Sequence, residues 1–357
     1  MDEKARIALI GAGWWATEAH MPALLDHKDA VLAAICDMDP ARLRTAAEAF
    51  NVKRTYAGYE QMLAHEELDG VIIVTPHATH YPLARACLEH NLHVLLEKPM
   101  TLLAKDAKAL VDLAADRTRP DGRGLELIVG YPYNYLPHSR RARDVILSGE
   151  LGAVQYATCS FSSNVRGFLG GQVGDGYSPT RYTIQGPSAA YNSPDLLGGG
   201  QGHLQITHSA GLLFFITGLR AEQVHALMRN HGLALDLVDA ITVAFEGGAV
   251  GMVGGTGNAG LNYRMALSVY CEDGCFLADT LAGVALIRRR DGSTEDLTAL
   301  PRPQMRRGVT HNFVDVILGR AENGSPGEVG WRTVELLDAA YRSAACNGAG
   351  VRVSELY

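Results

Sequence analysis

Short apolar runs and helical stretches alternate over roughly the first third of the chain. The apolar runs are ARIALI (5–10), VLAAICD (31–37), GVIIVTP (70–76), HVLLEKP (93–99) and LELIVGY (125–131). The stretches between them place apolar residues at the three- and four-residue spacing of one helix face. Continuous apolar strands separated by helices are typical of a parallel sheet that is covered on both faces. We therefore expect a doubly wound α/β domain over residues 1–131.

The pattern changes after this region. Residues 132–150 have the spacing of one helix, and from residue 154 onward apolar and polar positions alternate in pieces separated by glycines. Such pieces are typical of strands in antiparallel hairpins with one solvent-facing side. Two further helices are expected near 310–319 and 331–347. We therefore expect an α+β domain over 132–357 with a large, mainly antiparallel open sheet.

A long segment with neither period lies inside the second half. Residues 164–200 are rich in Gly, Tyr, Pro and Ser and show no helical or strand pattern. A loop of this length in a compact protein is usually a binding loop, a lid or a subunit contact. Its candidates for contact with a substrate are Arg166, Arg181 and Tyr182, which offer hydrogen-bond donors and an aromatic face. An arginine there would also suit a carboxylate or sulfonate group.

The overall composition narrows the classes of function. Of the 357 residues, 47% are apolar and 20% are charged, as in a globular protein long enough for two domains. The net charge of −7 argues against nucleic acid or an anionic membrane as the main partner. No apolar run reaches the length of a membrane span, and we expect a cytoplasmic protein. The six cysteines form no C-x-x-C pair, so we expect reduced thiols and no metal site.

The first apolar run leads directly into GAGWWA, the G-x-G-x-x-A pattern of a dinucleotide-binding turn. Gly11 permits the tight turn, Gly13 lets the backbone approach a pyrophosphate, and Ala16 allows the next helix to pack close to the strand. The amino end of that helix favours the phosphate charge. Trp14 and Trp15 fall within the turn and are therefore expected beside the cofactor.

The second apolar run ends on an acid, Asp37, 21 residues beyond Ala16. A carboxylate at this position can accept hydrogen bonds from the ribose hydroxyls of NAD and would repel the 2′-phosphate of NADP. Met38 and Asp39 follow, so no basic residue stands beside Asp37, although Arg42 would favour NADP if that phosphate pointed toward it. The pattern indicates an NAD site.

Three further motifs give the chain its resemblance to a known family. The segment VIIVTPHATHYPLARACLEHNLHVLLEKP, from Val71 to Pro99, carries a TP-x-x-x-H element and an E-K-P element. LGGG at 197–200 is followed by His208, and SPGEVGWRTVELLDAAYRSA (325–344) has the pattern of a closing helix. With the dinucleotide turn, these motifs resemble the Gfo/Idh/MocA family, which includes glucose–fructose oxidoreductase, inositol dehydrogenase and related sugar dehydrogenases. The resemblance spans almost the whole chain and implies a Rossmann NAD-binding domain followed by a substrate-binding and oligomerisation domain.

The resemblance assigns catalytic roles to Lys98 and His208. Lys98 ends an apolar strand, where its ammonium could hydrogen-bond the reacting hydroxyl and favour alkoxide character. His208 stands eight residues after Gly200, the family's spacing for the histidine that takes the hydroxyl proton. Histidine titrates near neutral pH, as this role requires. In the family the peptide bond before Pro99 is commonly cis.

Neighbouring residues of the same motifs are expected to bind the cofactor. Thr75 and Pro76 end a strand and are expected to line the nicotinamide ribose, and Glu97 belongs to the same group. His77 and His80 follow at a helix start, where a histidine serves cofactor contact and ordinary capping or packing equally well.

Two departures from the family pattern affect the substrate site. Many members carry an aspartate four residues before the catalytic histidine, and this chain has Leu204 there. Either Gln205, His203 or a residue of the long loop supplies the missing polar group, or the chemistry is not simple alcohol oxidation. Tyr133 and Asn134 stand where many members carry a basic residue. They suit a neutral, polyhydroxylated ligand, and equally well ordinary packing at a domain junction.

The sequence thus predicts an NAD-dependent oxidoreductase that transfers a hydride between a ring hydroxyl of a sugar, sugar derivative or cyclitol and the nicotinamide. The altered site and the long loop leave two alternatives open. One is a glycoside hydrolase that retains NAD and works by transient sugar oxidation, elimination and re-reduction. The other is a non-catalytic sensor of NAD or sugar. The open sheet suggests pairing into a homodimer or homotetramer, as is usual in the family.

Overall fold

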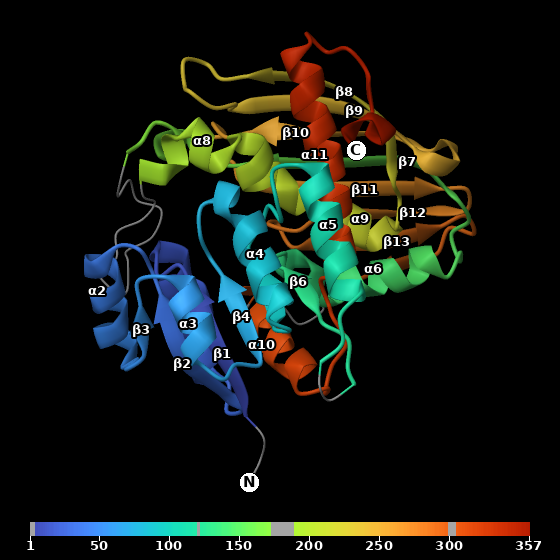
Figure 1. Ribbon diagram of the computed structural model, residues 1–357. Helices are drawn as coiled ribbons and strands as arrows, with labels where there is room; N and C mark the ends of the chain where they lie inside the picture. The colour runs from blue at the N-terminus through green and yellow to red at the C-terminus, as the bar shows by residue number, and fades with distance from the viewer. Residues whose placement is uncertain (1–3, 120–121, 173–188, 299–304) are drawn as a thin grey trace.

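The computed structural model describes residues 4–119, 122–172, 189–298 and 305–357. The chain forms two α/β units, each with its own sheet: the blue and cyan strands belong to one, and the green to orange strands to the other (Figure 1). Over these residues, no helix is both long enough and apolar enough to cross a membrane.

The amino-terminal sheet has six parallel strands in the order β3-β2-β1-β4-β5-β6. The strands are β1 (Ala5–Ile10), β2 (Ala30–Cys36), β3 (Thr55–Tyr56), β4 (Gly70–Ile73), β5 (His93–Leu96) and β6 (Leu127–Val129). The strand order reverses at β1, with β2 and β3 on one side and β4 to β6 on the other. Doubly wound sheets bind ligands at the carboxyl ends of the strands beside such a reversal. The predicted Rossmann fold is confirmed.

Both faces of this sheet are buried, which explains its continuous apolar strands. The covering helices are η1 (Ala16–His20), α1 (Met21–Asp26), α2 (Pro40–Phe50), α3 (Tyr59–His65), α4 (His80–Glu89) and α5 (Ala104–Ala115). Successive strand residues point to opposite faces. Ile7 and Ile72 therefore lie in one core with Met21 of α1, whereas Ile10 and Ile73 lie in a second core that includes α4.

A helix from the far end of the chain completes the first of these cores. Helix α10 (Met305–Ile317) places Phe313 in the core that contains β1 and α1. Gly70 of β4 makes room for it, because a side-chain carbon at Gly70 would lie 2.7 Å from the Phe313 ring. The domain boundary between residues 131 and 132 stays a prediction, and any division of the chain has to include α10 with the amino-terminal sheet.

The second sheet has nine strands in the order β14-β13-β12-β11-β7-β10-β9-β8-β15. The strands are β7 (Val154–Ser162), β8 (Ala221–Arg229), β9 (Val238–Phe245), β10 (Val250–Thr256), β11 (Arg264–Cys271), β12 (Gly274–Asp279), β13 (Val284–Arg289), β14 (Thr294–Asp296) and β15 (Val351–Arg352). All neighbours are antiparallel except β7 and β10, which are parallel. The prediction of a large, mainly antiparallel sheet is confirmed.

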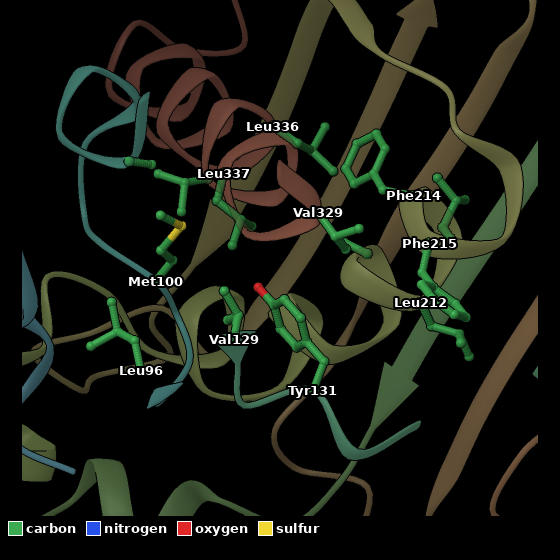
Figure 2. Close-up of a cluster of buried hydrophobic side chains, with 14 of the residues drawn as sticks. Leu96, Met100, Val129, Tyr131, Leu212, Phe214, Phe215, Val329, Leu336 and Leu337 are labelled. Carbon is green, nitrogen blue, oxygen red and sulfur yellow. The ribbon is translucent and has the colours of Figure 1, made fainter. Parts of the chain in front are cut away.

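Among the residues that the structure describes, helices cover one face of this sheet and leave the other open. Helices α9 (Thr207–Thr217) and α11 (Gly327–Ala345) pack on the covered face, and α6 (Pro137–Leu147) packs on α9. Figure 2 shows Leu336 of α11 and Phe214 of α9 pointing toward each other in this core. Apolar side chains on the opposite face stay exposed, and they include Leu227, Val250, Met252, Tyr270 and Val284.

Two predictions of local structure are corrected. Residues 132–150 form two helices, η3 (Pro132–Tyr135) and α6, because Leu136 between them has an extended backbone with ψ of 136°. A residue that precedes proline is disfavoured in helical conformation, and Pro137 follows. The segment 164–200 also contains short helices without a sequence period. They are α7 (Arg166–Leu169), η4 (Ala189–Asn192) and α8 (Pro194–Leu197).

Candidate active site

The dinucleotide turn has the backbone geometry that its glycines predict. Gly11 has a φ of +93°, and a side-chain carbon there would lie 2.2 Å from the carbonyl oxygen of Val74, so only glycine fits. At Gly13 a side-chain carbon would meet no atom within 4 Å, which leaves open space beside the backbone that leads into η1. The indole N–H of Trp14 is shielded from water and has no partner among the described residues. This open space at a helix start suits the pyrophosphate of a dinucleotide.

Asp37 fixes the same turn from the end of β2. Its carboxylate accepts hydrogen bonds from the backbone N–H groups of Ala12 and Asp39, each at 2.8 Å. A carboxylate has about four acceptor positions, so positions remain for ribose hydroxyls. Arg42 lies 3.4 Å from this carboxylate, which corrects the expectation that no basic residue stands beside Asp37. Asp39 caps α2, and the first turn of that helix brings Arg42 back to the strand end.

His80 joins the ends of β4 and β5. Its buried ring lies 2.9 Å from the carbonyl oxygen of Thr75 through Nε2 and 2.8 Å from that of Pro99 through Nδ1. Carbonyl oxygens only accept, so only the doubly protonated ring donates to both. Burial lowers the pKa of His80, and the two carbonyls oppose that shift. Thr75 and Pro76 remain partly exposed at the strand end. The predicted contacts of all three residues with the cofactor stay predictions.

His77 and His203 share one backbone acceptor. Their Nδ1 atoms lie 3.0 and 3.2 Å from the carbonyl oxygen of Leu197, so both rings carry the proton on Nδ1. Burial lowers the pKa of His77 well below its usual value, and it lowers that of His203 against the opposing charge of Asp236. These two histidines therefore connect η2 (His77–Thr79) of the amino-terminal unit to η5 (Gly202–Ile206) of the other.

Lys98 reaches from the end of β5 toward η5. The peptide bond between Lys98 and Pro99 is cis, as the family resemblance led us to expect. The ammonium donates to the carbonyl oxygen of Leu204 at 3.0 Å. Burial lowers the pKa of Lys98, and the neighbouring charge of Glu97 opposes this shift. Glu97 is itself buried and accepts a hydrogen bond from the indole N–H of Trp15 at 3.0 Å. The predicted cofactor contacts of Glu97 and Trp15 stay predictions.

His208 lies at the start of α9 within an aromatic enclosure. The centroid of its ring is 6.3 Å from that of Tyr131, 5.6 Å from that of Tyr133 and 6.1 Å from that of Phe161. Burial, and then the charge of Lys98, lower the pKa of His208 well below its usual value. Its Nδ1 is shielded from solvent and has no hydrogen-bond partner among the described residues, while the residue as a whole is partly exposed. A neutral imidazole with an unpaired nitrogen is able to accept a proton.

The side chain of Leu204 does not take the place of the family aspartate. It is buried in an apolar cluster with Leu197 and Leu235, and only its backbone carbonyl faces Lys98. Gln205, the next residue of the π-helical turn η5, is partly exposed. The predicted roles of Gln205 and His203 in place of that aspartate stay predictions.

The glycine-rich motif at 197–200 lets α11 pack closely against the start of η5. A side-chain carbon at Gly199 would lie 2.0 Å from the hydroxyl of Tyr341, and one at Gly200 would lie 2.1 Å from the carbonyl oxygen of Asp236. The carboxylate of Asp236 accepts from the N–H groups of Gly200 and Gly202 at 2.6 and 2.9 Å, and from the Tyr341 hydroxyl at 3.0 Å. Sequence reasoning missed Asp236, which no local motif marks, and Tyr341, which lies in the closing-helix motif (325–344) but was not singled out there.

The two candidates at the domain junction differ in position. Tyr133 is partly exposed and lies against the ring of His208, where it remains a substrate-binding candidate. Asn134 is fully buried and donates to the hydroxyl of Ser325 at 3.1 Å. This contact favours the packing interpretation of Asn134.

The candidates in the long loop are not brought to the site by the described structure. Arg166 is exposed on α7, with one guanidinium nitrogen 3.5 Å from the carbonyl oxygen of His231. Arg181 and Tyr182 lie outside the described residues. Within the described ranges, no group of three or more His, Cys, Asp or Glu side chains is placed to hold a metal ion.

Sequence reasoning also missed His20. This buried residue of η1 donates through Nε2 to Glu97 at 2.9 Å, and its Nδ1 lies 2.9 Å from the hydroxyl of Thr310 in α10. In the sequence His20 is only a histidine in the helix after the dinucleotide turn. This position does not distinguish a hydrogen bond to Glu97 from simple packing.

Comparison with curated proteins gives two informative relatives. D-xylose 1-dehydrogenase (NADP(+)) 2 of Haloferax volcanii is 36% identical over 130 residues, which cover 36% of this chain and 38% of that relative. The dTDP-3,4-didehydro-2,6-dideoxy-alpha-D-glucose 3-reductase of Saccharopolyspora spinosa is 25% identical, and the match covers 97% of this chain and 99% of that relative. Among solved structures, an oxidoreductase domain protein from Kribbella flavida superimposes with a TM-score of 0.81 at 21% identity, covering 99% of this chain and 100% of that one.

Two family models match consecutive parts of the chain. Residues 5–120 match the oxidoreductase family with an NAD-binding Rossmann fold, and residues 139–277 match the Gfo/Idh/MocA carboxy-terminal domain. The amino-terminal unit is therefore an NAD-binding domain, in agreement with the open space at Gly13. Together with the fold and the position of the E-K-P turn, these matches show that the chain belongs to the Gfo/Idh/MocA oxidoreductase family.

Proposed function

We propose that this protein is an NAD-dependent dehydrogenase that oxidises a ring hydroxyl of a sugar, sugar derivative or cyclitol. One observation supports the proposal: the ammonium of Lys98 is bound about one helical turn from His208. Lys98 donates to the carbonyl oxygen of Leu204 at 3.0 Å, and His208 follows four residues later, where η5 continues into α9. Both match the family's catalytic positions in sequence, and Lys98 follows β5 at the carboxyl ends of the strands, where doubly wound sheets bind ligands.

The two side chains divide the chemistry of the hydroxyl group between them. The ammonium of Lys98 donates to the hydroxyl oxygen and stabilises negative charge as it develops there. The neutral ring of His208, which is partly exposed, accepts the hydroxyl proton. NAD, when bound at the dinucleotide turn, supplies the acceptor for the hydride. Gly11, Gly13 and Asp37 would hold the dinucleotide, with Thr75 and Pro76 beside its nicotinamide end.

The surroundings of His208 keep its ring in the neutral form. A carboxylate at position 204 would stabilise a protonated imidazole, but Leu204 turns its side chain into an apolar cluster. An imidazolium beside Lys98 would therefore face a like charge without a compensating acid from this position. The neutral ring is the resting form, and a neutral ring accepts a proton as alcohol oxidation requires.

The class of substrate is supported by the chemistry of the enclosure and by the relatives. Tyr133 offers an aromatic face beside His208, and such faces suit the C–H surface of a sugar ring. The curated relatives described above are named for reactions on xylose and on a deoxy sugar nucleotide. Neither name supports the retained-NAD hydrolase or the non-catalytic sensor. The open face of the nine-stranded sheet, with Leu227 and Met252 exposed, supports self-association into a homo-oligomer.

The test is an absorbance assay for NADH with purified protein, added NAD and a panel of aldoses, anhydrosugars and cyclitols. Formation of NADH with at least one substrate, slowed by about 100-fold or more in Lys98→Met and in His208→Asn, is the expected result. Small molecules released by denaturation are analysed by mass spectrometry in parallel. Tightly retained NAD, together with cleavage of glycosides and no NADH, would overturn the proposal in favour of the hydrolase.

A further inference from the structure

The carboxylate of Glu97 is held at three points within the amino-terminal unit. Oε1 accepts from the indole N–H of Trp15 at 3.0 Å and from Nε2 of His20 at 2.9 Å. Oε2 accepts from the backbone N–H of Lys98 at 3.1 Å. Because a carboxylate only accepts, the bond from His20 fixes the proton of that ring on Nε2. The orientation of Glu97 is therefore set by residues from the helix that follows the dinucleotide turn.

The far side of His20 is held by a segment distant in sequence. Its Nδ1 lies 2.9 Å from the hydroxyl of Thr310, which is fully buried in α10. We call the set of Glu97, Trp15, His20 and Thr310 the Glu97 anchor. It links η1, the end of β5 and α10, three elements whose relative positions define this edge of the sheet.

The space around Glu97 is closed on its remaining side. A side-chain carbon at Gly130, which follows β6, would lie 2.8 Å from Oε1 of Glu97. Gly130 has no positive φ, so its backbone conformation does not itself require glycine, and the three atoms nearest to such a carbon all belong to the Glu97 carboxylate. The position of Glu97 is therefore a reason for glycine at this point.

Only one of the described groups whose charges act on Lys98 is negative. Burial disfavours its ammonium, and the groups whose charges interact with it are one carboxylate and four histidines: Glu97, His77, His80, His203 and His208. A histidine carries either a positive charge or none, so none of the four supplies a negative charge. Leu204 contributes a carbonyl dipole but no charge. Among the described groups that act on Lys98, Glu97 alone is anionic.

We propose that His20 is a positioning residue that fixes Glu97, and that Glu97 supplies the negative charge that keeps Lys98 an ammonium at the reaction centre. This proposal rests on the proposed function in one respect. The charge on Lys98 matters for catalysis because that function makes Lys98 the donor to the substrate hydroxyl. Oε2 of Glu97 lies 3.1 Å from the backbone nitrogen of Lys98, so the negative charge stands beside this residue in a largely buried setting, where charges interact strongly.

Titration of Lys98 itself tests the proposal without substrate or activity. The full-length protein is trace-labelled with acetic anhydride across a pH series, and the acetylation of Lys98 is quantified by mass spectrometry of its peptide. Only the neutral amine reacts, so the midpoint of the labelling curve reports the pKa of Lys98. We expect Glu97→Gln to lower this midpoint by about one unit or more, because an adjacent opposite charge typically shifts a pKa by 1–3 units.

Variants of the Glu97 anchor test the role of His20. His20→Leu removes the bond to Glu97, and Gly130→Ala displaces the carboxylate sterically, so both should lower the midpoint in the same direction as Glu97→Gln. His20→Gln keeps an N–H within reach of Glu97 and should restore the midpoint largely to that of the unaltered protein. The matched control is Glu335→Gln, which neutralises another buried glutamate, in α11. This control should leave the Lys98 midpoint unchanged.

The outcomes separate this proposal from the proposed function. An unchanged Lys98 midpoint in Glu97→Gln overturns the proposal, whatever the enzyme's activity. A shift in Glu97→Gln with unchanged midpoints in both His20→Leu and Gly130→Ala overturns the role of His20. If Glu97→Gln fails to fold, the other two variants decide, since they retain the carboxylate. A lack of dehydrogenase activity together with the expected shifts would reject the proposed function and leave the Glu97 anchor standing.

Discussion

The ammonium of Lys98 donates to the backbone carbonyl of Leu204 at 3.0 Å, so a backbone oxygen faces the catalytic lysine at the position where the family resemblance implies an aspartate. The side chain of Leu204 is only 4% exposed and packs with Val165 and Leu237 on the other side. Leu204 thus has two separate roles. Its side chain packs in an apolar cluster, and its backbone carbonyl accepts a hydrogen bond from Lys98.

This division predicts the effects of substitutions at position 204. Leu204→Ala should lower the free energy of unfolding by about 2–5 kcal/mol, since it removes buried methyl groups from a packed cluster. Its kcat/KM per folded molecule should change less than about threefold, because the carbonyl that binds Lys98 is retained. Chemical denaturation and steady-state kinetics on the same preparations check both statements. A gain in kcat/KM for Leu204→Asp would contradict this account, since it would require the new carboxylate to reach the site.

Replacement of the lysine should affect the reaction far more than the fold. Lys98→Met keeps the length of the side chain and removes the ammonium, so kcat/KM should fall by about 10²–10³, the usual loss when one donor to a developing oxyanion is removed. Binding of NAD, measured by calorimetry, should be retained because Gly11, Gly13 and Asp37 are untouched. Loss of NAD binding to the same degree as activity would instead assign Lys98 to cofactor binding.

The pH dependence of the reaction should report both catalytic groups. His208 has a pKa well below its usual value through burial and the charge of Lys98, so it stays neutral and competent at pH values below about 6.5. Lys98 has a lowered pKa through burial, so the alkaline limb of kcat/KM should begin below its usual value of about 10.4. His208→Asn should lower kcat/KM by about 10²–10⁴ and abolish the acidic limb. An acidic limb that persists in His208→Asn would assign the base to another residue.

The sequence predicts those parts of the molecule that depend on local pattern. Continuous apolar strands identify the parallel sheet, and the E-K-P element places Lys98 at a strand end because strand and turn are adjacent in sequence. Helix α10 could not be assigned to the amino-terminal sheet, because its apolar stripe fits either sheet equally well. Its partners, such as Ile7, lie hundreds of residues away and are chosen by packing in three dimensions.

The same limit applies within the candidate active site. His208 is found through its spacing from Gly200, but His20 and Thr310 are separated by 290 residues and meet only in the folded chain. The interaction of Arg42 with Asp37 is missed for a different reason. The two residues are five apart in sequence, and only the direction of the first turn of α2 brings the guanidinium back to the strand end.

That interaction predicts how cofactor preference can be changed. Asp37→Ser removes the carboxylate that would repel a 2′-phosphate and leaves Arg42 free to bind it, so the ratio of kcat/KM for NADP to that for NAD should rise about 10- to 100-fold. This range corresponds to one hydrogen bond to a charged group, about 1.5–3 kcal/mol. Adding Arg42→Ala should reverse the gain. If Asp37→Ser alters both cofactors equally, the carboxylate serves only to hold the turn through Ala12 and Asp39.

A buried acid away from the site gives a prediction about stability. Asp239 of β9 is 3% exposed, and burial first, then the neighbouring Asp236, raise its pKa well above the usual value. A raised pKa in the folded state means that Asp239 contributes stability fully below its unfolded pKa of about 3.9, and that this contribution is lost as the pH rises through the folded value. Asp239→Asn cannot ionise and keeps an N–H donor. The change that it causes in the free energy of unfolding should therefore be more favourable at pH 8 than at pH 4.5, by about 1–3 kcal/mol. Urea denaturation of both proteins at the two pH values measures this difference. An equal effect at both pH values would mean that Asp239 ionises in the folded protein as readily as in the unfolded chain.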